Sequence, residues 1–261
     1  MGMFLYVAIA FFGAAIGSFL NVCIWRIPEG RSIVSPPSHC PACGHKIRFS
    51  DNIPVISYLL LGGRCRDCRD KISARYPLVE LLTAALAAIL FWKYGLSLKF
   101  LFSFLFVATL VVITFIDLDH QIIPDVISLP GIPIFFLLAL FVMGLPFLES
   151  LLGILIGGGS LYLVAACYEL ITKREGMGGG DIKLLAMLGA FLGWKSLLFI
   201  VLVSSLLGAL VGITLMIWKG RDMKYAVPFG PFLSLGAIAY LFFGAWLSGL
   251  FFPEVFISGP M

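Results

Sequence analysis

One stretch decides how the rest of this sequence is interpreted: Gly176-Met177-Gly178-Gly179-Gly180-Asp181-Ile182-Lys183. It places a carboxylate directly behind a run of glycines, in a chain that is otherwise typical of membrane proteins. A carboxylate close to hydrocarbon is costly, so we take Asp181 as a candidate functional residue that requires a partner. Gly178 and Gly180 leave the backbone bare, which would let another polypeptide approach closely. The alternative is that Asp181 only caps a helix.

Asp117 is the best partner for Asp181. It follows a long apolar run, in Phe115-Ile116-Asp117-Leu118-Asp119-His120. Two carboxylates that each stand at the end of an apolar segment would form an acid–base pair if the fold brings them together. The alternative is that Asp117 lies in a solvated loop.

The composition excludes a soluble globular protein. The chain has 261 residues, of which 61% are hydrophobic and 12% charged, and its mean hydropathy is +1.06. Soluble domains average about 45–50% apolar residues. The net charge of +4 is small, so it gives no reason to expect nucleic-acid binding. Residues 3–25 have no basic residues before them, which favours a retained membrane span over a signal peptide.

Apolar runs predict an all-α polytopic membrane protein with about eight transmembrane helices. Residues 26–77 interrupt them and contain nine of the 18 Lys and Arg residues and four of the six cysteines. We therefore predict a first transmembrane helix at 1–25, a small cytoplasmic zinc-binding domain at 26–77 and a seven-helix membrane core at 78–261. The eight apolar segments are 3–25, 78–92, 97–116, 126–146, 150–171, 182–193, 196–218 and 231–252.

The basic residues predict the orientation, because Lys and Arg are enriched in cytoplasmic loops. With residues 26–77 in the cytoplasm, fifteen of the 18 Lys and Arg residues fall on that side, and only Lys93, Lys99 and Lys195 fall outside. In this arrangement Asp117 and Asp181 both reach the cytoplasmic face, although 64 positions separate them in the sequence.

The segment 182–193 is short for a membrane span, since it would cross only about 18 Å as a helix. We expect either a locally thin membrane or a watery cavity beside the glycines. A re-entrant loop is the alternative. It is disfavoured because it would place Lys219, Arg221 and Lys224 outside.

Four cysteines form two pairs, Cys40-Pro41-Ala42-Cys43 and Cys65-Arg66-Asp67-Cys68, with 21 residues between them. Four thiolates complete a closed tetrahedral shell, so we predict a structural zinc ion. The metal would supply folding energy that so small a domain cannot obtain from an apolar core. A redox dithiol and two disulfides are the alternatives, and His39 and His45 are further possible ligands.

The segment Asp117–Asp125 offers three carboxylates and His120 as candidate catalytic groups. Asp117 ends the apolar run and should be the deepest, with Asp119 and Asp125 further into the loop. Two buried carboxyl groups can share one proton, so that one activates water while the other protonates the leaving group. Asp117 and Asp181 would then perform aspartyl protease chemistry at a membrane edge.

Other features favour structural roles. Glycines and other small residues in 13–18 and 157–159 predict close helix packing. Cys23 and Cys167 lie in apolar runs, where thiols are usually packing residues. Glu80 either pairs with Arg75 or faces the cavity.

Together these residues resemble the bacterial type IV prepilin peptidases, which are leader peptidases and N-methyltransferases. Gly178-x-Gly180-Asp181 also looks like the signature of intramembrane aspartyl proteases of the presenilin type. The family's catalytic pair falls on Asp117 and Asp181, with Gly178 and Gly180 beside it, and its metal ligands fall on the four paired cysteines. The resemblance rests on Ser18-Phe19-Leu20-Asn21-Val22, the cysteine pairs, Arg75-Tyr76-Pro77 with Val79-Glu80, Asp117–Asp125 and Gly178–Asp181.

The resemblance implies a multi-pass protein of the bacterial inner membrane that lies among lipid and binds no nucleic acid. It implies cleavage of the short basic leader from type IV prepilins and pseudopilins at the cytoplasmic face. It also implies methylation of the new amino terminus with S-adenosylmethionine, for which the residues alone show no site. Three alternatives remain at this stage: a transporter with an aspartate relay, a non-enzymatic scaffold that recruits a partner, and a peptidase without methyltransferase activity.

Overall fold

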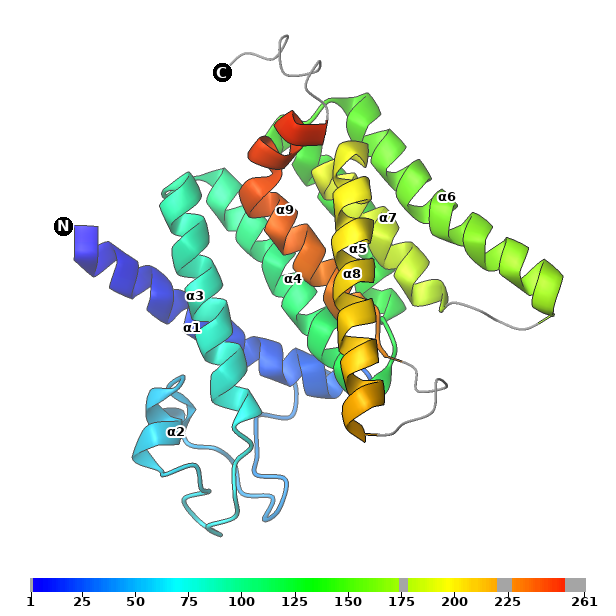
Figure 1. Ribbon diagram of the computed structural model, residues 1–261. Coiled ribbons are helices and arrows are strands. Elements are labelled where there is room, and N and C mark those ends of the chain that lie inside the picture. The colour runs from blue at the N-terminus through cyan, green and yellow to red at the C-terminus, as the bar shows by residue number, and fades with distance from the viewer. Residues whose placement is uncertain (1, 174–177, 220–226, 252–261) are drawn as a thin grey trace. The chain divides into compact units, whose positions relative to one another are not determined.

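The computed structural model describes residues 2–173, 178–219 and 227–251 and is all-α in these ranges (Figure 1). Gly176 and Met177 of the stretch quoted first lie outside the described residues. The chain divides into two compact units, 1–116 and 117–261. The three-part division at residues 25 and 77 concerns sequence composition and remains a prediction.

In the first unit, helix α1 (Gly2–Arg26) packs along helix α3 (Arg75–Tyr94). The contact is close because two glycines of α1 face α3. A methyl group added at Gly13 would lie 2.7 Å from Cβ of Ala87, and one at Gly17 would lie 2.7 Å from Cα of Glu80. This confirms the packing role predicted for the small residues of the first span.

The segment between α1 and α3 contains only the short helices η1 (Phe49–Asn52) and α2 (Ile56–Leu60). Arg26 is buried at the end of α1 and donates hydrogen bonds to the carbonyl oxygens of Ser32 (2.9 Å) and Pro36 (2.8 Å). These bonds tie the beginning of the connection back to the helix.

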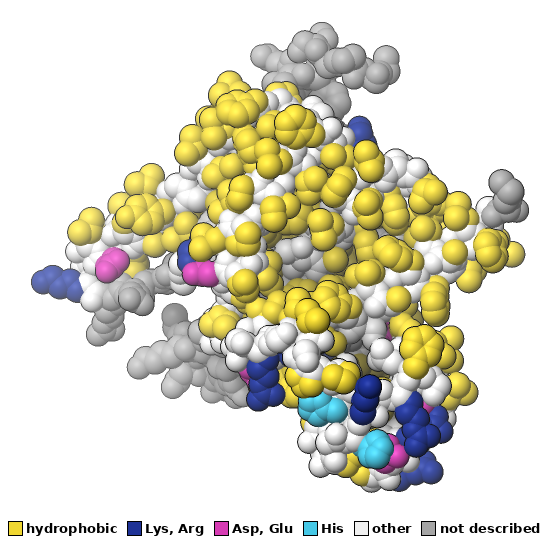
Figure 2. All heavy atoms as spheres, turned by 180° about the vertical axis from the view of Figure 1, so that it is seen from behind, with side chains coloured by type: hydrophobic (Ala, Val, Ile, Leu, Met, Phe, Trp, Pro, Cys, Tyr) yellow, Lys and Arg dark blue, Asp and Glu magenta, His cyan; other side chains and the backbone are white. Residues whose placement is uncertain are grey.

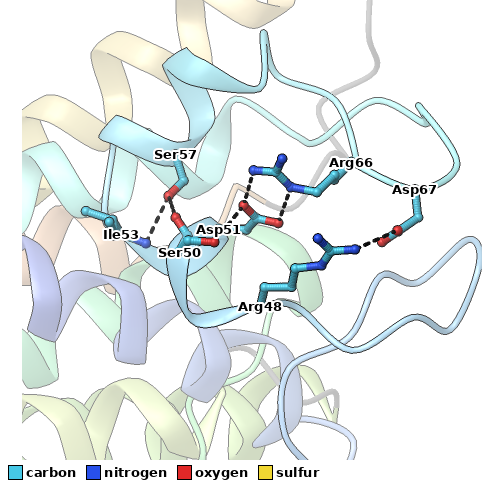
Figure 3. Close-up of polar contacts among 7 residues, drawn as sticks. All are labelled: Arg48, Ser50, Asp51, Ile53, Ser57, Arg66 and Asp67. Carbon is cyan, nitrogen blue, oxygen red and sulfur yellow. Dashed lines mark hydrogen bonds and ion pairs between the residues drawn. The ribbon is translucent and has the colours of Figure 1, made fainter.

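Ion pairs link the region around η1 to the second cysteine pair (Figure 3). Asp51 receives two hydrogen bonds from Arg66, at 2.8 and 2.6 Å, and Arg48 lies 3.7 Å from Asp67. The bidentate bond to Arg66 lowers the pKa of Asp51. Because the segment has few buried apolar side chains, polar contacts of this kind hold much of it together.

Helix α4 (Leu98–His120) crosses the boundary, so its last turn belongs to the second unit. The helix includes Asp119 and His120, which were expected in a loop. Both side chains are nevertheless exposed, and Asp117 is the buried carboxylate of this turn. The predicted order of depth is therefore correct.

The second unit is built around helix α7 (Gly179–Leu192), whose residues 184–191 are all buried. Gly189 of α7 meets Gly153 of α6 (Phe147–Thr172) backbone to backbone, and a methyl group at Gly157 would lie 2.6 Å from the carbonyl oxygen of Leu185. Gly157 therefore has the predicted packing role. The remaining helices of this unit are α5 (Asp125–Leu138), the π-helical turn η2 (Ala139–Met143), α6 (Phe147–Thr172), α8 (Trp194–Lys219) and α9 (Gly230–Phe251).

Within the described ranges, six helices are long and apolar enough to cross a membrane: those at 2–26, 75–94, 98–120, 125–143, 147–172 and 194–218. Hydrophobic side chains dominate the face shown in Figure 2, while Lys, Arg and His gather over the cysteine-bearing segment. The all-α polytopic fold class is confirmed. Whether the shorter helix α7 and helix α9 also cross the bilayer remains a prediction.

Candidate active site and metal site

Asp117 lies at the end of α4 and is only 5% exposed. Its Oδ2 accepts a hydrogen bond of 2.9 Å from the backbone N–H of Gly230, the first residue of α9. The first N–H groups of a helix have no partner within the helix, so a carboxylate placed there satisfies one of them. The same contact offsets part of the cost of burying a negative charge on Asp117.

Asp181 lies in the first turn of α7 and is half-buried. Gly178 is the N-cap residue of this helix, and no side chain caps the helix. The predicted alternative, in which Asp181 serves only as a cap, is therefore not what the structure shows. Burial raises the pKa of Asp181, and the nearby carboxylate of Asp117 raises it further, to about 6.

Ile123 connects the surroundings of the two carboxylates. A methyl group added at Gly180 would lie 2.9 Å from its Cβ, and one at Gly230 would lie 3.3 Å from its Cδ1. The buried isoleucine thus packs against the glycine that precedes Asp181 and the glycine that binds Asp117. The fold brings Asp117 and Asp181 to one site around this side chain.

The glycines beside Asp181 differ in their surroundings. Gly180 needs to be small because Ile123 lies against it. Gly178 is exposed, and a methyl group added to it would have Oδ2 of Asp181 as its nearest neighbour, at 4.0 Å. Gly179 is also exposed, and an added methyl group there would have no neighbour within 4 Å. Among the residues that the structure describes, none covers Gly178 or Gly179 on this side of the turn beside Asp181.

Asp125 does not join the pair. It is exposed at the start of α5, and its Oδ1 forms an ion pair of 2.6 Å with Lys183 of α7. This bond connects the beginnings of two helices that border the site. It gives Asp125 a structural role, and exposed pairs of this kind contribute at most about 1 kcal/mol.

Sequence reasoning missed Gly230 and Ile123. The only local signal for Gly230 is its place in Pro228-Phe229-Gly230-Pro231, a pattern typical of a helix start but not of a carboxylate contact. In the sequence, nothing distinguishes Ile123 from any other apolar residue of the segment between α4 and α5. Their roles depend on contacts between residues far apart in the sequence.

The four paired cysteines form a second site in the first unit. Each pair lies in a turn with the same hydrogen bonds. Cys40 N–H donates to the carbonyl oxygen of His45 (2.9 Å), and Cys65 N–H donates to that of Asp70 (2.8 Å). The residue after each second cysteine, Gly44 or Arg69, has a positive φ. The two turns are therefore built alike, which brings both thiols of each pair to the same side.

The arrangement fits a tetrahedral metal ion. All four sulfur atoms lie within 4.8 Å of one another, and those of Cys40 and Cys68 are 3.8 Å apart. Thiolates bound to zinc at about 2.3 Å are about 3.8 Å apart in a regular tetrahedron. Backbone N–H groups of Cys68 and Asp67 lower the pKa of Cys65 to about 7, which favours the thiolate that zinc requires. His39 and His45 are not part of the cluster.

We expect one zinc ion per chain in protein purified without chelators. Cys43→Ser should reduce the zinc content to well below one per chain and loosen residues 40–71, because a thiolate is lost from the shell. Cys167→Ser is the matched control, since Cys167 is also exposed and lies outside the cluster. Elemental analysis measures both variants, and wild-type protein without zinc would contradict the prediction.

Comparisons with known proteins agree with these sites. Residues 11–94 match the bacterial peptidase A24 N-terminal domain, and residues 104–213 match the type IV leader peptidase family. Three similar proteins are named prepilin leader peptidase/N-methyltransferase. They come from Pseudomonas putida (38% identity, covering 94% of this chain and 90% of that protein), Neisseria gonorrhoeae (40%, 87% and 86%) and Aeromonas hydrophila (40%, 92% and 91%).

No solved structure matches the chain significantly. The relatives cover nearly its whole length, and both family models fall on the segments that carry the two sites. These findings decide against the transporter and the scaffold considered above. The chain belongs to the type IV prepilin leader peptidase/N-methyltransferase family.

Proposed function

We propose that this chain removes the leader from type IV prepilins and pseudopilins with Asp117 and Asp181, and then methylates the new amino terminus. The family and its relatives support the two reactions. The observation that carries the catalytic assignment is the meeting of both carboxylates around Ile123 in the second unit.

The surroundings of the two aspartates suggest their starting states. The backbone N–H of Gly230 stabilises negative charge on Asp117, whereas burial and the neighbouring charge of Asp117 raise the pKa of Asp181, so we assign the one proton that the pair shares to Asp181. In cleavage, Asp117 would take a proton from the attacking water. Asp181 would give its proton to the amine that leaves as the peptide bond breaks.

Gly178 and Gly179 would give the extended segment around the scissile bond access to the site. A peptide backbone must approach the carboxylates closely, and side chains at these positions would stand in its way. The apolar helix that follows the cleavage site in the substrate would remain among lipid, which is consistent with a protease whose catalytic residues lie at the ends of apolar helices.

Zinc would have a structural role, because four cysteines leave no position for water or substrate. S-adenosylmethionine is the methyl donor we propose, by analogy with the relatives named for this activity. When bound, it supplies a methyl group to the amine nitrogen, which loses a proton as the donor leaves as a neutral thioether.

We further propose the orientation in the bacterial inner membrane. Residues 26–77, 117–125, 172–181 and 219–230 should be cytoplasmic and both termini outside, because fifteen of the 18 Lys and Arg residues then lie inside. A reporter enzyme that is active only outside the cytoplasm should be inactive when fused after residue 224 and active after residue 97. The reverse result at 224 would favour re-entry of α7.

One assay tests the proposed function directly. The purified protein is mixed with a prepilin, or with a pseudopilin, and S-adenosylmethionine. Mass spectrometry should show loss of the leader and then a gain of one methyl group at the new amino terminus. Cleavage without methylation would support a peptidase alone, and an unchanged precursor would contradict the proposal.

A further inference from the structure

The first unit contains a cavity of about 400 Å³ that the peptidase reaction does not use. Its walls come from the end of α1, the beginning of α3 and the cysteine-bearing segment between them. Cys40 and Cys65 belong to the lining, so the metal site forms part of the wall. The volume falls in the range of small-molecule and cofactor sites, about 300–1,000 Å³.

Glu80 places a buried carboxylate in the wall of this cavity. It is only 7% exposed, and its Oε2 accepts a hydrogen bond of 2.7 Å from the backbone N–H of Val55. In the described part of the chain no basic side chain forms an ion pair with it. Arg75, a predicted partner, instead donates to the carbonyl oxygen of Phe115. A buried carboxylate without a counter-ion in the protein is suited to a cationic ligand.

The backbone at Val55 is strained. Its φ is +61°, in a region that β-branched residues rarely adopt. Strain of this kind persists only where the surrounding structure enforces it, and it clusters at ligand sites. Here it accompanies the hydrogen bond between Val55 and Glu80 in the cavity wall. The wall therefore resembles a built site rather than a packing defect.

The rest of the lining offers groups for a heteroaromatic ligand. Nδ2 of the buried Asn21 donates to the carbonyl oxygen of Tyr76 (3.1 Å), and within the described residues its Oδ1 accepts no hydrogen bond. The rings of Trp25, Tyr58 and Tyr76 also border the cavity. Aromatic faces bind both flat bases and cations.

We propose that this cavity holds S-adenosylmethionine, with Glu80 recognising its positive charge and the aromatic rings and Asn21 contacting its adenosine part. The inference rests on the proposed methyltransferase function and assigns that function a site. The donor carries a sulfonium and an ammonium group, so its charge complements Glu80, and its adenine ring suits the aromatic lining. Methylation and cleavage then use different units of the chain.

The test measures binding without any pilin. Full-length zinc-loaded protein in detergent is dialysed against labelled S-adenosylmethionine. Glu80→Gln keeps the size and an acceptor for Val55 but removes the charge, so we expect at least about tenfold weaker binding, as for loss of a buried charged contact. Binding of S-adenosylhomocysteine, which lacks the sulfonium charge, should weaken less.

Glu149→Gln is the matched control, because Glu149 forms an ion pair with Lys195 in the second unit and lies outside the cavity lining. It should bind the donor as the wild type does. Trp25→Ala is the second test variant. Trp25 is already partly exposed, so we expect α1 to stay packed while donor binding weakens. Zinc content and thermal unfolding report whether each variant is folded.

Photo-crosslinking of the labelled donor to the wild-type protein locates the site without any variant. Peptides covering residues 18–26 or 51–58 should carry the label. If the wild type methylates prepilin but crosslinks elsewhere, or if Glu80→Gln binds normally, the site assignment is overturned and the proposed function stands. A wild-type protein that neither binds the donor nor methylates prepilin would overturn both.

Discussion

Asp117→Asn and Asp181→Asn should each reduce leader cleavage by about 10³-fold or more, since each removes one half of an acid–base pair. Asparagine keeps the size of the side chain but cannot exchange a proton with water or with the leaving amine. Initial rates of leader loss from a purified prepilin, followed by mass spectrometry, measure the effect. Both variants should remain folded and still bind the precursor.

The double variant distinguishes a pair from two independent groups. If Asp117 and Asp181 act as a unit, the variant with both substitutions should be little slower than either single variant. If the two aspartates contributed independently, the fold-losses in cleavage rate of the two single variants would instead multiply in the double variant.

Asp125→Asn and Asp119→Asn are the matched controls, because both side chains are exposed and neighbour the same site. Their effects should be milder. Loss of Asp125 removes one ion pair with Lys183, which is worth at most about 1 kcal/mol. If Asp119→Asn stopped cleavage while Asp117→Asn left it intact, the choice of the deeper carboxylate would be wrong.

The two carboxylates were predictable because each stands where an apolar segment meets polar sequence. An aspartate at such a boundary is unusual enough to be noticed without any structure. The positive-inside pattern then suggested that both reach one face. The contact that stabilises Asp117 was not predictable, because Gly230 lies 113 residues away and carries no side chain whose chemistry could identify it.

The four cysteines were predictable for a different reason. Their spacing is local, and a C-x-x-C turn can be recognised from four residues. By contrast, the boundary at residues 116 and 117 falls inside the continuous helix α4. Composition changes at residues 25 and 77, where polar sequence begins and ends. Contacts between helices depend on which apolar faces meet. The apolar runs are too uniform in composition for the sequence to predict which face of each helix contacts a neighbour.

Gly230→Ala should reduce leader cleavage by about 10²-fold, the effect expected when a catalytic group is displaced by about 1 Å. The added methyl group would lie 2.7 Å from Oδ2 and 3.3 Å from Cγ of Asp117, and 3.3 Å from Cδ1 of Ile123. The carboxylate must therefore turn or move away from the N–H group that stabilises its charge. Gly230 does not have a positive φ, so the expected loss comes from the contact and not from backbone strain.

Gly2→Ala is the control, because Gly2 is also the first residue of its helix, α1, but has nothing within 4 Å of an added methyl group. The backbone of both helices should tolerate alanine at the first position. Any effect of alanine on helix stability is therefore common to the two variants and cancels when their rates are compared. The two variants should differ in their cleavage rates but unfold at the same temperature. Equal rates would show that Asp117 can shift without losing its function, and the N–H group of Gly230 would then have no part in catalysis.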